Sequence, residues 1–183
     1  MNWTDTNLPG VMVLQSPPRE DHRGAFARLF CERELAPLLG NRHIVQINRS
    51  MTRAVGAIRG MHFQHPPAAE TKIVQCLQGR VFDVAVDLRR DSLTFLQWTG
   101  CELTPGAANA LFIPEGFAHG FQVLDENSAL LYMHTAFYDP ALEGAVRFDD
   151  PRVGVRWPLP PTDMSERDAG HPVLLEDFSG IAP

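Results

Sequence analysis

The clearest strand pattern in the chain is Val81-Phe-Asp-Val-Ala-Val-Asp-Leu88. In an extended strand the even-numbered side chains share one face and the odd-numbered ones share the other. The first face is wholly apolar, and the second alternates Val81 and Ala85 with Asp83 and Asp87. The alternation predicts a β-strand that packs against a hydrophobic core.

Similar short runs with a period of two residues recur along the chain, separated by Gly, Pro, Asn and Asp. They predict strands over His43–Ser50, Ala57–Phe63, Lys72–Leu77, Thr94–Thr99, Ala110–Ile113, His119–Leu124 and Ala129–Phe137. The one convincing helix is Cys31–Leu39, with acidic residues in its first turn, Pro37 inside it and Gly40 after it. Many short strands with almost no helix predict an all-β fold, an antiparallel jelly-roll barrel or sandwich.

Length and composition narrow the protein class. The 183 residues, 44% hydrophobic and 21% charged, suit one globular domain over residues 1–183, with a proline-rich strap from Asp149 to Pro183. Apolar runs are too short for a membrane span and Met1–Gly10 is polar, so we expect a cytoplasmic protein. Three cysteines without CxxC spacing indicate reduced thiols. The formal charge of −6 with scattered basic residues argues against nucleic-acid or anionic-membrane partners.

Two stretches of the sequence contain residues that could take part in catalysis or bind a metal ion. Arg59-Gly-Met-His-Phe-Gln64 precedes Lys72 and Gly79, and Pro114-Glu-Gly-Phe-Ala-His119-Gly delivers a histidine from a turn. Together they resemble the two motifs of the cupin superfamily. Metal-binding cupins use an HxH pair and a glutamate in the first motif, where this chain has Gln64 and Lys72. Because an ammonium repels a divalent cation, a metal site would have to recruit His65 or Glu70 instead.

A wider series of matches occurs in order along about residues 20–172. It comprises Asp21-x-Arg-Gly-x-Phe26, Gln46-x-Asn48, RGMHFQ at 59–64, Gly79–Arg89 with Ser92 and Thr94, IPEGFAHGF at 113–121, Tyr132 with Tyr138, Asp149-Asp-Pro151, Trp157-Pro158 and Ser165-x-Arg-Asp168. This series resembles the dTDP-4-dehydrorhamnose 3,5-epimerase family of metal-independent cupin-type enzymes. The resemblance implies inversion of C3, C5 or both in a nucleoside diphosphate 4-keto-6-deoxyhexose, without metal or nicotinamide.

The chemistry of that reaction requires a base, an acid across the sugar and a positive group near the C4 oxygen. The resemblance assigns the base to His62, oriented by Asp168, the acid to Tyr132 and the cation to Lys72. Three structural alternatives stay open: an exposed tail carboxylate for Asp168, a strand anchor for Tyr132 and a surface position for Lys72. Lys72 is the only lysine of the chain, and its two tyrosines are Tyr132 and Tyr138.

The resemblance also implies the substrate contacts and the assembly. Arg23 and Arg59 match diphosphate-binding positions, Tyr138 matches the aromatic that stacks on the nucleotide base, and further contacts match Gln46, Asn48, His119, Glu143 and Arg167. The family forms homodimers in which N-terminal strands, here about residues 1–30, extend the partner's sheet, so Arg23 and Phe26 are expected to reach the neighbouring site.

Two residues stand apart from these matches. Arg28 stands where the family has a glutamate that contacts the nucleoside, which leaves the base specificity open. His134 shares the strand face of Tyr132 and is interpreted as structural.

Other functions on the same scaffold remain open from the sequence. They are a mono-epimerase acting on one carbon of another nucleotide sugar, a metal-dependent cupin oxygenase or isomerase, and a non-catalytic nucleotide-sugar binder.

Overall fold

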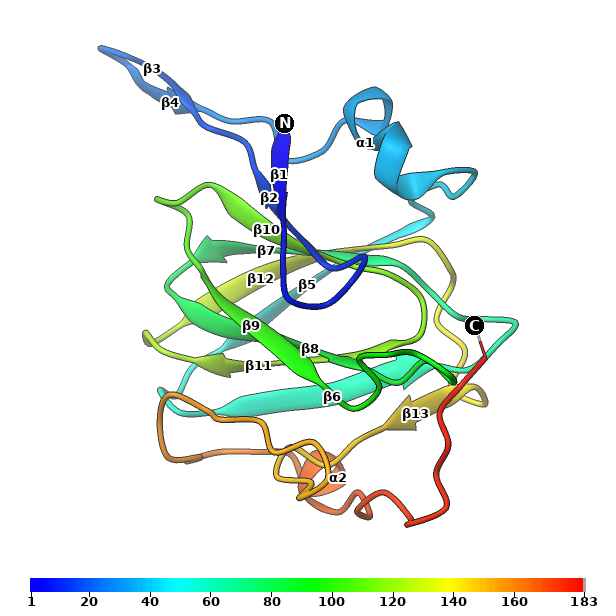
Figure 1. Cartoon of the computed structure of the whole chain (residues 1–183). Helices are drawn as coiled ribbons and strands as arrows, with labels where there is room; N and C mark the ends of the chain where they lie inside the picture. Colours follow the sequence, from blue (N-terminus) through cyan, green and yellow to red (C-terminus); the bar gives the residue numbers. More distant parts are fainter. Residues whose placement is uncertain (183) are drawn as a thin grey trace.

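Two antiparallel sheets face each other in the computed structural model, which describes residues 1–182 (Figure 1). The six-stranded sheet has the order β1 (Asn2–Asp5), β2 (Met12–Gln15), β10 (Asn109–Ile113), β7 (Lys72–Gln78), β12 (Ser128–His134) and β5 (Gln46–Thr52). The five-stranded sheet has the order β13 (Glu143–Ala145), β6 (Ile58–Gln64), β11 (Phe117–Val123), β8 (Val81–Asp87) and β9 (Trp98–Leu103). From β5 to β12 the chain passes repeatedly from one sheet to the other, which confirms the predicted jelly roll.

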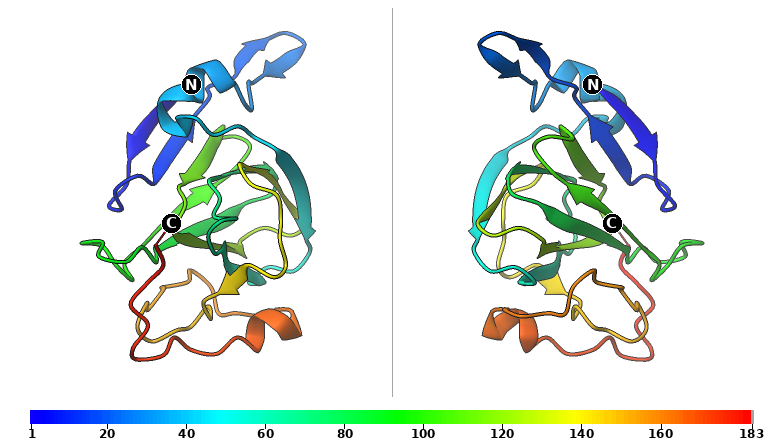
Figure 2. Two further views of the ribbon diagram at one scale, coloured as in Figure 1. Left: turned by 90° about the vertical axis from the view of Figure 1, so that its right-hand side faces the viewer. Right: turned by 90° about the vertical axis from the view of Figure 1, so that its left-hand side faces the viewer.

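The strand β8 is buried on both faces, for different reasons. Its inward face belongs to the core between the sheets, with Val81 and Ala85 completely buried. Its outward face, with Val84 and Val86, packs against side chains of the C-terminal segment, including Trp157, Phe178 and Ile181. The predicted alternation is therefore correct, and the even-numbered face is apolar because the C-terminal segment covers it (Figure 2).

Two aspartates of β8 are buried and paired. Asp83 accepts a hydrogen bond from His119 Nε2 at 2.8 Å. Asp87 accepts from the Ser92 and Thr94 hydroxyls, each at 2.6 Å, and from the guanidinium of Arg89.

The hydrogen bonds to Asp87 also explain the largest error of the sequence prediction. The strand predicted over Thr94–Thr99 is wrong, because residues 92–97 form turns that carry the Ser92 and Thr94 hydroxyls to Asp87. Leu96 adopts a φ of 62°, outside the β region, and the strand β9 begins only at Trp98. The other predicted strands are present with shifted ends; β12, for example, ends at His134 instead of continuing to Phe137.

The helix α1 (Glu32–Leu39) confirms the helix prediction and packs on the six-stranded sheet. Leu35 and Leu39 are buried against Leu14 and Ile73. The helix ends where the Gly40 N–H donates to the carbonyl of Ala36 at 3.0 Å.

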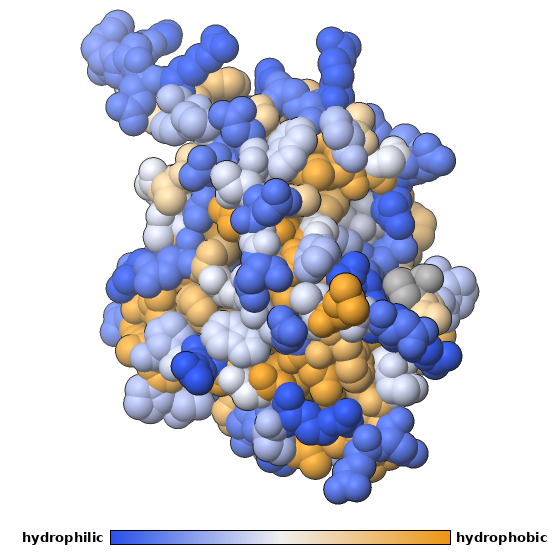
Figure 3. All heavy atoms as spheres, viewed as in Figure 1, coloured by the Kyte–Doolittle hydropathy of each residue, from blue (hydrophilic) through white to orange (hydrophobic). Residues whose placement is uncertain are grey.

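The remaining elements lie outside the two sheets. The strands β3 (Arg19–Asp21) and β4 (Gly24–Phe26) pair in a hairpin that projects away from them (Figures 1 and 2). Its surface is largely hydrophilic, whereas apolar surface gathers at the other end of the molecule (Figure 3). The short helix α2 (Glu166–Ala169) lies next to β6 in the C-terminal segment. Neither helix of the described chain has the length and apolar character needed to cross a membrane.

Candidate active site

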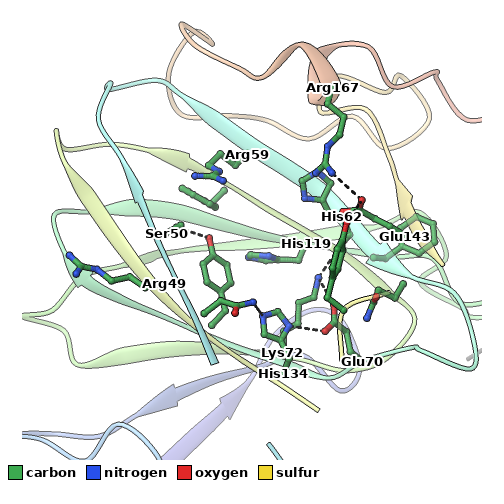
Figure 4. A pocket seen from close by; sticks show the side chains of 16 residues that line it. Arg49, Ser50, Arg59, His62, Glu70, Lys72, His119, His134, Glu143 and Arg167 are labelled. Carbon is green, nitrogen blue, oxygen red and sulfur yellow. Dashed lines mark hydrogen bonds and ion pairs between the residues drawn. The ribbon is translucent and has the colours of Figure 1, made fainter. Parts of the chain in front are cut away.

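A cavity of about 370 Å³ lies between the two sheets (Figure 4). Both sheets and the connecting segments contribute side chains to it. The lining residues are Asn48, Arg49, Ser50, Arg59, His62, Phe63, Gln64, Glu70, Lys72, His119, Phe121, Tyr132, His134, Tyr138, Glu143 and Arg167. Most of them are polar or charged, so the cavity suits a polar ligand.

His62 lies on β6 and is held by a buried carboxylate. Its Nε2 lies 3.0 Å from Asp168 Oδ1, and the Gly60 N–H donates to Asp168 Oδ2 at 3.1 Å. Burial opposes ionisation of Asp168, but the hydrogen bonds from His62 and Gly60 outweigh it and hold the pKa of this carboxyl well below its usual value. A carboxylate accepts from Nε2–H, which leaves the lone pair of the neutral imidazole on Nδ1.

The helix α2 supplies Asp168 from far along the chain. Ser165 caps the helix by accepting the Asp168 N–H at 3.0 Å. The neighbouring Arg167 reaches toward the cavity and pairs with Glu143 at 3.0 Å. Glu143 also accepts from the Tyr138 hydroxyl at 3.1 Å, so these three side chains are linked at one side of the site.

Tyr132 faces the cavity from β12, in the sheet opposite to His62. Its hydroxyl shares a hydrogen bond with Ser50 Oγ at 3.1 Å. The ring packs edge-on against the ring of His119, whose Nε2 is bonded to Asp83. Burial raises the pKa of the Tyr132 phenol, so the hydroxyl stays protonated at neutral pH.

Lys72 begins β7 and is buried, with only 8% of its surface exposed. Its Nζ lies 3.1 Å from Glu70 Oε1 and donates to the carbonyl of His62 at 3.3 Å. An ammonium is therefore fixed in the same cavity as His62 and Tyr132.

The side chains that a cupin metal site would need are engaged elsewhere. The amide of Gln64 donates to the carbonyls of Ala68 and Phe137 and accepts from the Asp139 N–H. Glu70 is paired with Lys72 and His134.

One other group of possible metal ligands lies in the described chain. His62, Asp168 and His171 place their ligand atoms within 4.8 Å of one another. The Arg167 guanidinium lies 3.6 Å from Asp168 and opposes a cation there.

Most of the predicted site residues come together. Nine of them line the cavity: Asn48, Arg59, His62, Lys72, His119, Tyr132, Tyr138, Glu143 and Arg167. Asp168 lies behind His62, and Gln46 accepts the Tyr138 N–H at 3.2 Å at the edge of the site.

Three predicted residues lie outside this cavity, in or next to the projecting hairpin. Arg23 pairs with Asp21, Phe26 is 74% exposed, and Arg28 pairs with Glu34. Within a single chain these side chains do not contact the site.

The structure also adds residues that the sequence reasoning did not place in the site. They are Ser50, which bonds Tyr132, Asp83, which holds His119, and Glu70, which joins Lys72 to His134. The alternation of β8 placed Asp83 on the same strand face as Val81 and Ala85, which the structure shows to be the inward face. Nothing in the local pattern marked Ser50, and Glu70 was named only as a residue that a metal site would have to recruit.

The sheet order and the cavity between the sheets define a cupin-like jelly roll, the fold class that the sequence predicted. Comparison with known proteins then identifies the family. A family model described as dTDP-4-dehydrorhamnose 3,5-epimerase matches residues 5–176. The dTDP-4-dehydrorhamnose 3,5-epimerase of Salmonella typhimurium is 40% identical over 173 residues, which cover 92% of this chain and 93% of that protein.

Two solved structures are similar over most of the chain. That of dTDP-6-deoxy-D-glucose-3,5-epimerase from Legionella pneumophila, in complex with dTDP-4-keto-L-rhamnose, has a TM-score of 0.92 at 33% identity and covers 100% of this chain and 98% of its own. That of a 3′-monoepimerase from Streptomyces bikiniensis, in complex with dTDP-quinovose, has a TM-score of 0.84 at 28% identity, with 92% and 85% covered. The chain belongs to the dTDP-4-dehydrorhamnose 3,5-epimerase family, which places it among the isomerases.

Proposed function

We propose that the protein inverts C3 and C5 of dTDP-4-dehydro-6-deoxy-D-glucose and so forms dTDP-4-dehydro-L-rhamnose. The observation that carries the proposal is the placement of His62 and Tyr132 on opposite sheets of one cavity, which Lys72 also lines. Epimerisation needs a base and an acid on opposite faces of the sugar, and this arrangement supplies both.

The base is His62. Its Nδ1 removes the proton from a carbon next to the C4 ketone, and the electron pair passes to the C4 oxygen to form an enolate. Asp168 accepts from Nε2–H, fixes the tautomer and stabilises the imidazolium that results.

Lys72 and Tyr132 complete the step. The Lys72 ammonium stabilises the negative charge that develops on the C4 oxygen. Tyr132 gives its hydroxyl proton to the opposite face of the same carbon, and the electron pair returns from the enolate. The imidazolium then loses its proton and the phenolate regains one, so the reaction consumes nothing.

Exchange of carbon-bound hydrogen tests the function. The purified protein is incubated with dTDP-4-dehydro-6-deoxy-D-glucose in deuterated water and followed by NMR. Deuterium is expected at both C3 and C5 of the inverted sugar. Failure of either carbon to take up deuterium, with intact protein, would contradict the assignment.

A mono-epimerase is the second candidate, because the similar monoepimerase of Streptomyces bikiniensis has the same fold. The same experiment separates the two: a mono-epimerase exchanges and inverts only one of the two carbons.

The proposed site is completed by a second copy of the chain. The β3–β4 hairpin projects from the sheets and carries Arg23 and the exposed Phe26 (Figure 1). We propose that in a homodimer the hairpin reaches the partner's cavity, where Arg23 and Arg59 bind the diphosphate. In this assembly Tyr138 stacks on the nucleotide base, and Arg28 stays close to the hairpin of its own chain.

A further inference from the structure

A buried ion bridge lines the same side of the cavity as Tyr132. The Glu70 side chain is only 7% exposed and joins two partners, Lys72 Nζ at 3.1 Å and His134 Nδ1 at 2.7 Å. The strand register explains how they meet, because His134 on β12 lies opposite Lys72 on β7, and Glu70 precedes Lys72 by two residues. The labelled side chains of Figure 4 show the three groups together.

The bridge continues to the proposed acid. His134 follows Tyr132 by two residues on the same strand, so both rings lie on the cavity face. The rings are nearly parallel, with an angle of 17° between their planes and 6.1 Å between their centroids. Asn48 Nδ2 lies 3.4 Å from His134 Nε2, so the imidazole ring is held at both nitrogens.

The Glu70 carboxylate opposes the positive charge of Lys72 within the bridge. Burial opposes ionisation of Glu70, but its hydrogen bond with His134 and the positive charge of Lys72 outweigh it, so the pKa of Glu70 lies below its usual value. Glu70 therefore supplies one full negative charge beside the Lys72 ammonium. A buried ammonium without such a partner would be strongly destabilised.

We propose that Glu70 and His134 are positioning residues for the enolate and its reprotonation, Glu70 through Lys72 and His134 through the ring of Tyr132. The proposal rests on the proposed epimerase function and adds two residues to it. The His62 ring is held by Asp168 of the C-terminal segment and meets the bridge only through its backbone carbonyl, which accepts from Lys72. Loss of His134 is therefore expected to spare proton removal and to impair proton delivery from the other face, whereas loss of the Glu70 charge is expected to slow enolate formation as well, because Lys72 stabilises the enolate.

The two half-reactions can be measured separately in deuterated water. When the enolate is reprotonated by His62, after its proton has exchanged with solvent, recovered substrate contains deuterium without inversion. When Tyr132 delivers the proton, the product is inverted. The ratio of deuterated substrate to inverted product therefore reports on the acid side, whereas general damage to the fold lowers both signals together.

The variants are Glu70→Gln, His134→Ala and His134→Phe. Glu70→Gln keeps the shape and removes the charge, and His134→Phe keeps a ring against Tyr132. We expect His134→Ala to raise the ratio about tenfold or more, and Glu70→Gln to lower exchange and inversion together while circular dichroism reports an intact fold. In both variants kcat should fall about 10- to 100-fold, with a smaller change in KM. His134→Phe should restore part of the inversion that His134→Ala loses.

A second His–Glu pair of the chain provides the matched control. His43 Nδ1 contacts Glu32 on the exposed surface near α1, away from the cavity. Glu32→Gln and His43→Ala are expected to leave the ratio unchanged.

The two proposals fail in different ways. An unchanged ratio in His134→Ala or an unchanged kcat in Glu70→Gln, with an active wild-type protein, would overturn the positioning role of that residue alone. A wild-type protein that exchanges neither carbon would overturn the epimerase function itself.

Discussion

At the residue scale, the proposed mechanism depends on the single lysine and on one of the two tyrosines. The chain carries 16 Lys and Arg residues, of which Lys72 alone is lysine. Lys72 is held between Glu70 and the carbonyl of His62, where its compact ammonium makes both contacts. A planar guanidinium on a longer side chain would present its donors in a different geometry. The rare residue types therefore lie where the proposed mechanism needs them.

The conservative substitutions Lys72→Arg and Tyr132→Phe test this dependence. Arginine and phenylalanine are the residue types that the chain uses elsewhere, and each is similar in size to the residue that it replaces. The melting temperature of each variant should therefore change little. Each removes one group of the proposed mechanism, and turnover of the 4-keto sugar should fall about 10²-fold or more. Steady-state kinetics of the two variants check this, and near wild-type kcat in either one would remove that residue from the mechanism.

The protonation state of Tyr132 can be measured directly because the chain has only two tyrosines. Burial disfavours the charged phenolate and raises the pKa of Tyr132, so the proton should remain in place above pH 10, where a free phenol loses it. In the variant Tyr138→Phe, ultraviolet absorbance should show no phenolate up to about pH 11 while circular dichroism reports an intact fold. A phenolate signal from folded protein at pH 10 would contradict this.

At the element scale, the site depends on the close approach of β6 and β11. Gly60 has a φ of +120°, and a Cβ there would lie 2.5 Å from the Gly120 Cα and 2.7 Å from the His119 carbonyl oxygen. Gly60 also donates its N–H to Asp168, so the same position sets both the strand spacing and the carboxylate behind His62.

The substitution Gly60→Ala should therefore separate the two strands. We expect it to lower the free energy of unfolding by roughly 2 kcal/mol or more and to abolish most turnover. The matched control is Gly106→Ala, where a Cβ would meet nothing within 4 Å. Urea denaturation of the two variants compares the effects; equal stability in both would show that the close approach is not needed.

Local sequence patterns correctly predicted the strands and the helix whose signal lies within a single element. The alternation of Val81–Leu88 and the capped helix that ends at Leu39 are examples. The strand over Thr94–Thr99 was wrong because Asp87 captures the Ser92 and Thr94 hydroxyls, a contact that no periodicity reveals. The short strand β13 has only three residues, too few to show a period.

The site itself was predictable only where motifs marked it. Asp168 is 106 residues from His62, and only the family resemblance brought the two together before the structure did. The bridge of Glu70 and His134 had no such motif, because it arises from the register of β7 against β12.

At the scale of the whole molecule, one chain leaves the proposed site open. In the described structure the β3–β4 hairpin makes no hydrogen bond or ion pair with the cavity residues of its own chain, although it carries two residues that the family resemblance places in the site. Phe26 is 74% exposed at the end of β4, and Arg23 pairs only with Asp21 in the described chain. In the proposed two-fold dimer each copy supplies the same hairpin to the other, so both cavities are completed in the same way.

Mixing two inactive variants tests this assembly. Arg23→Ala removes the contributed arginine, and Tyr132→Phe removes the acid. If the hairpin acts in the partner's cavity, a mixed dimer combines the intact Tyr132 of one chain with the intact Arg23 of the other in one of its two sites. An equal mixture, unfolded and refolded together, should then regain about a quarter of wild-type activity, since half of the dimers are mixed and each has one complete site.

The control is each variant refolded alone, which should remain inactive. If Arg23 instead acted in its own chain's cavity, every site in the mixture would lack either Arg23 or Tyr132, and no activity would return. Light scattering on the same samples gives the mass of the assembly, and a monomer at micromolar concentration would rule out a shared site whatever the kinetics.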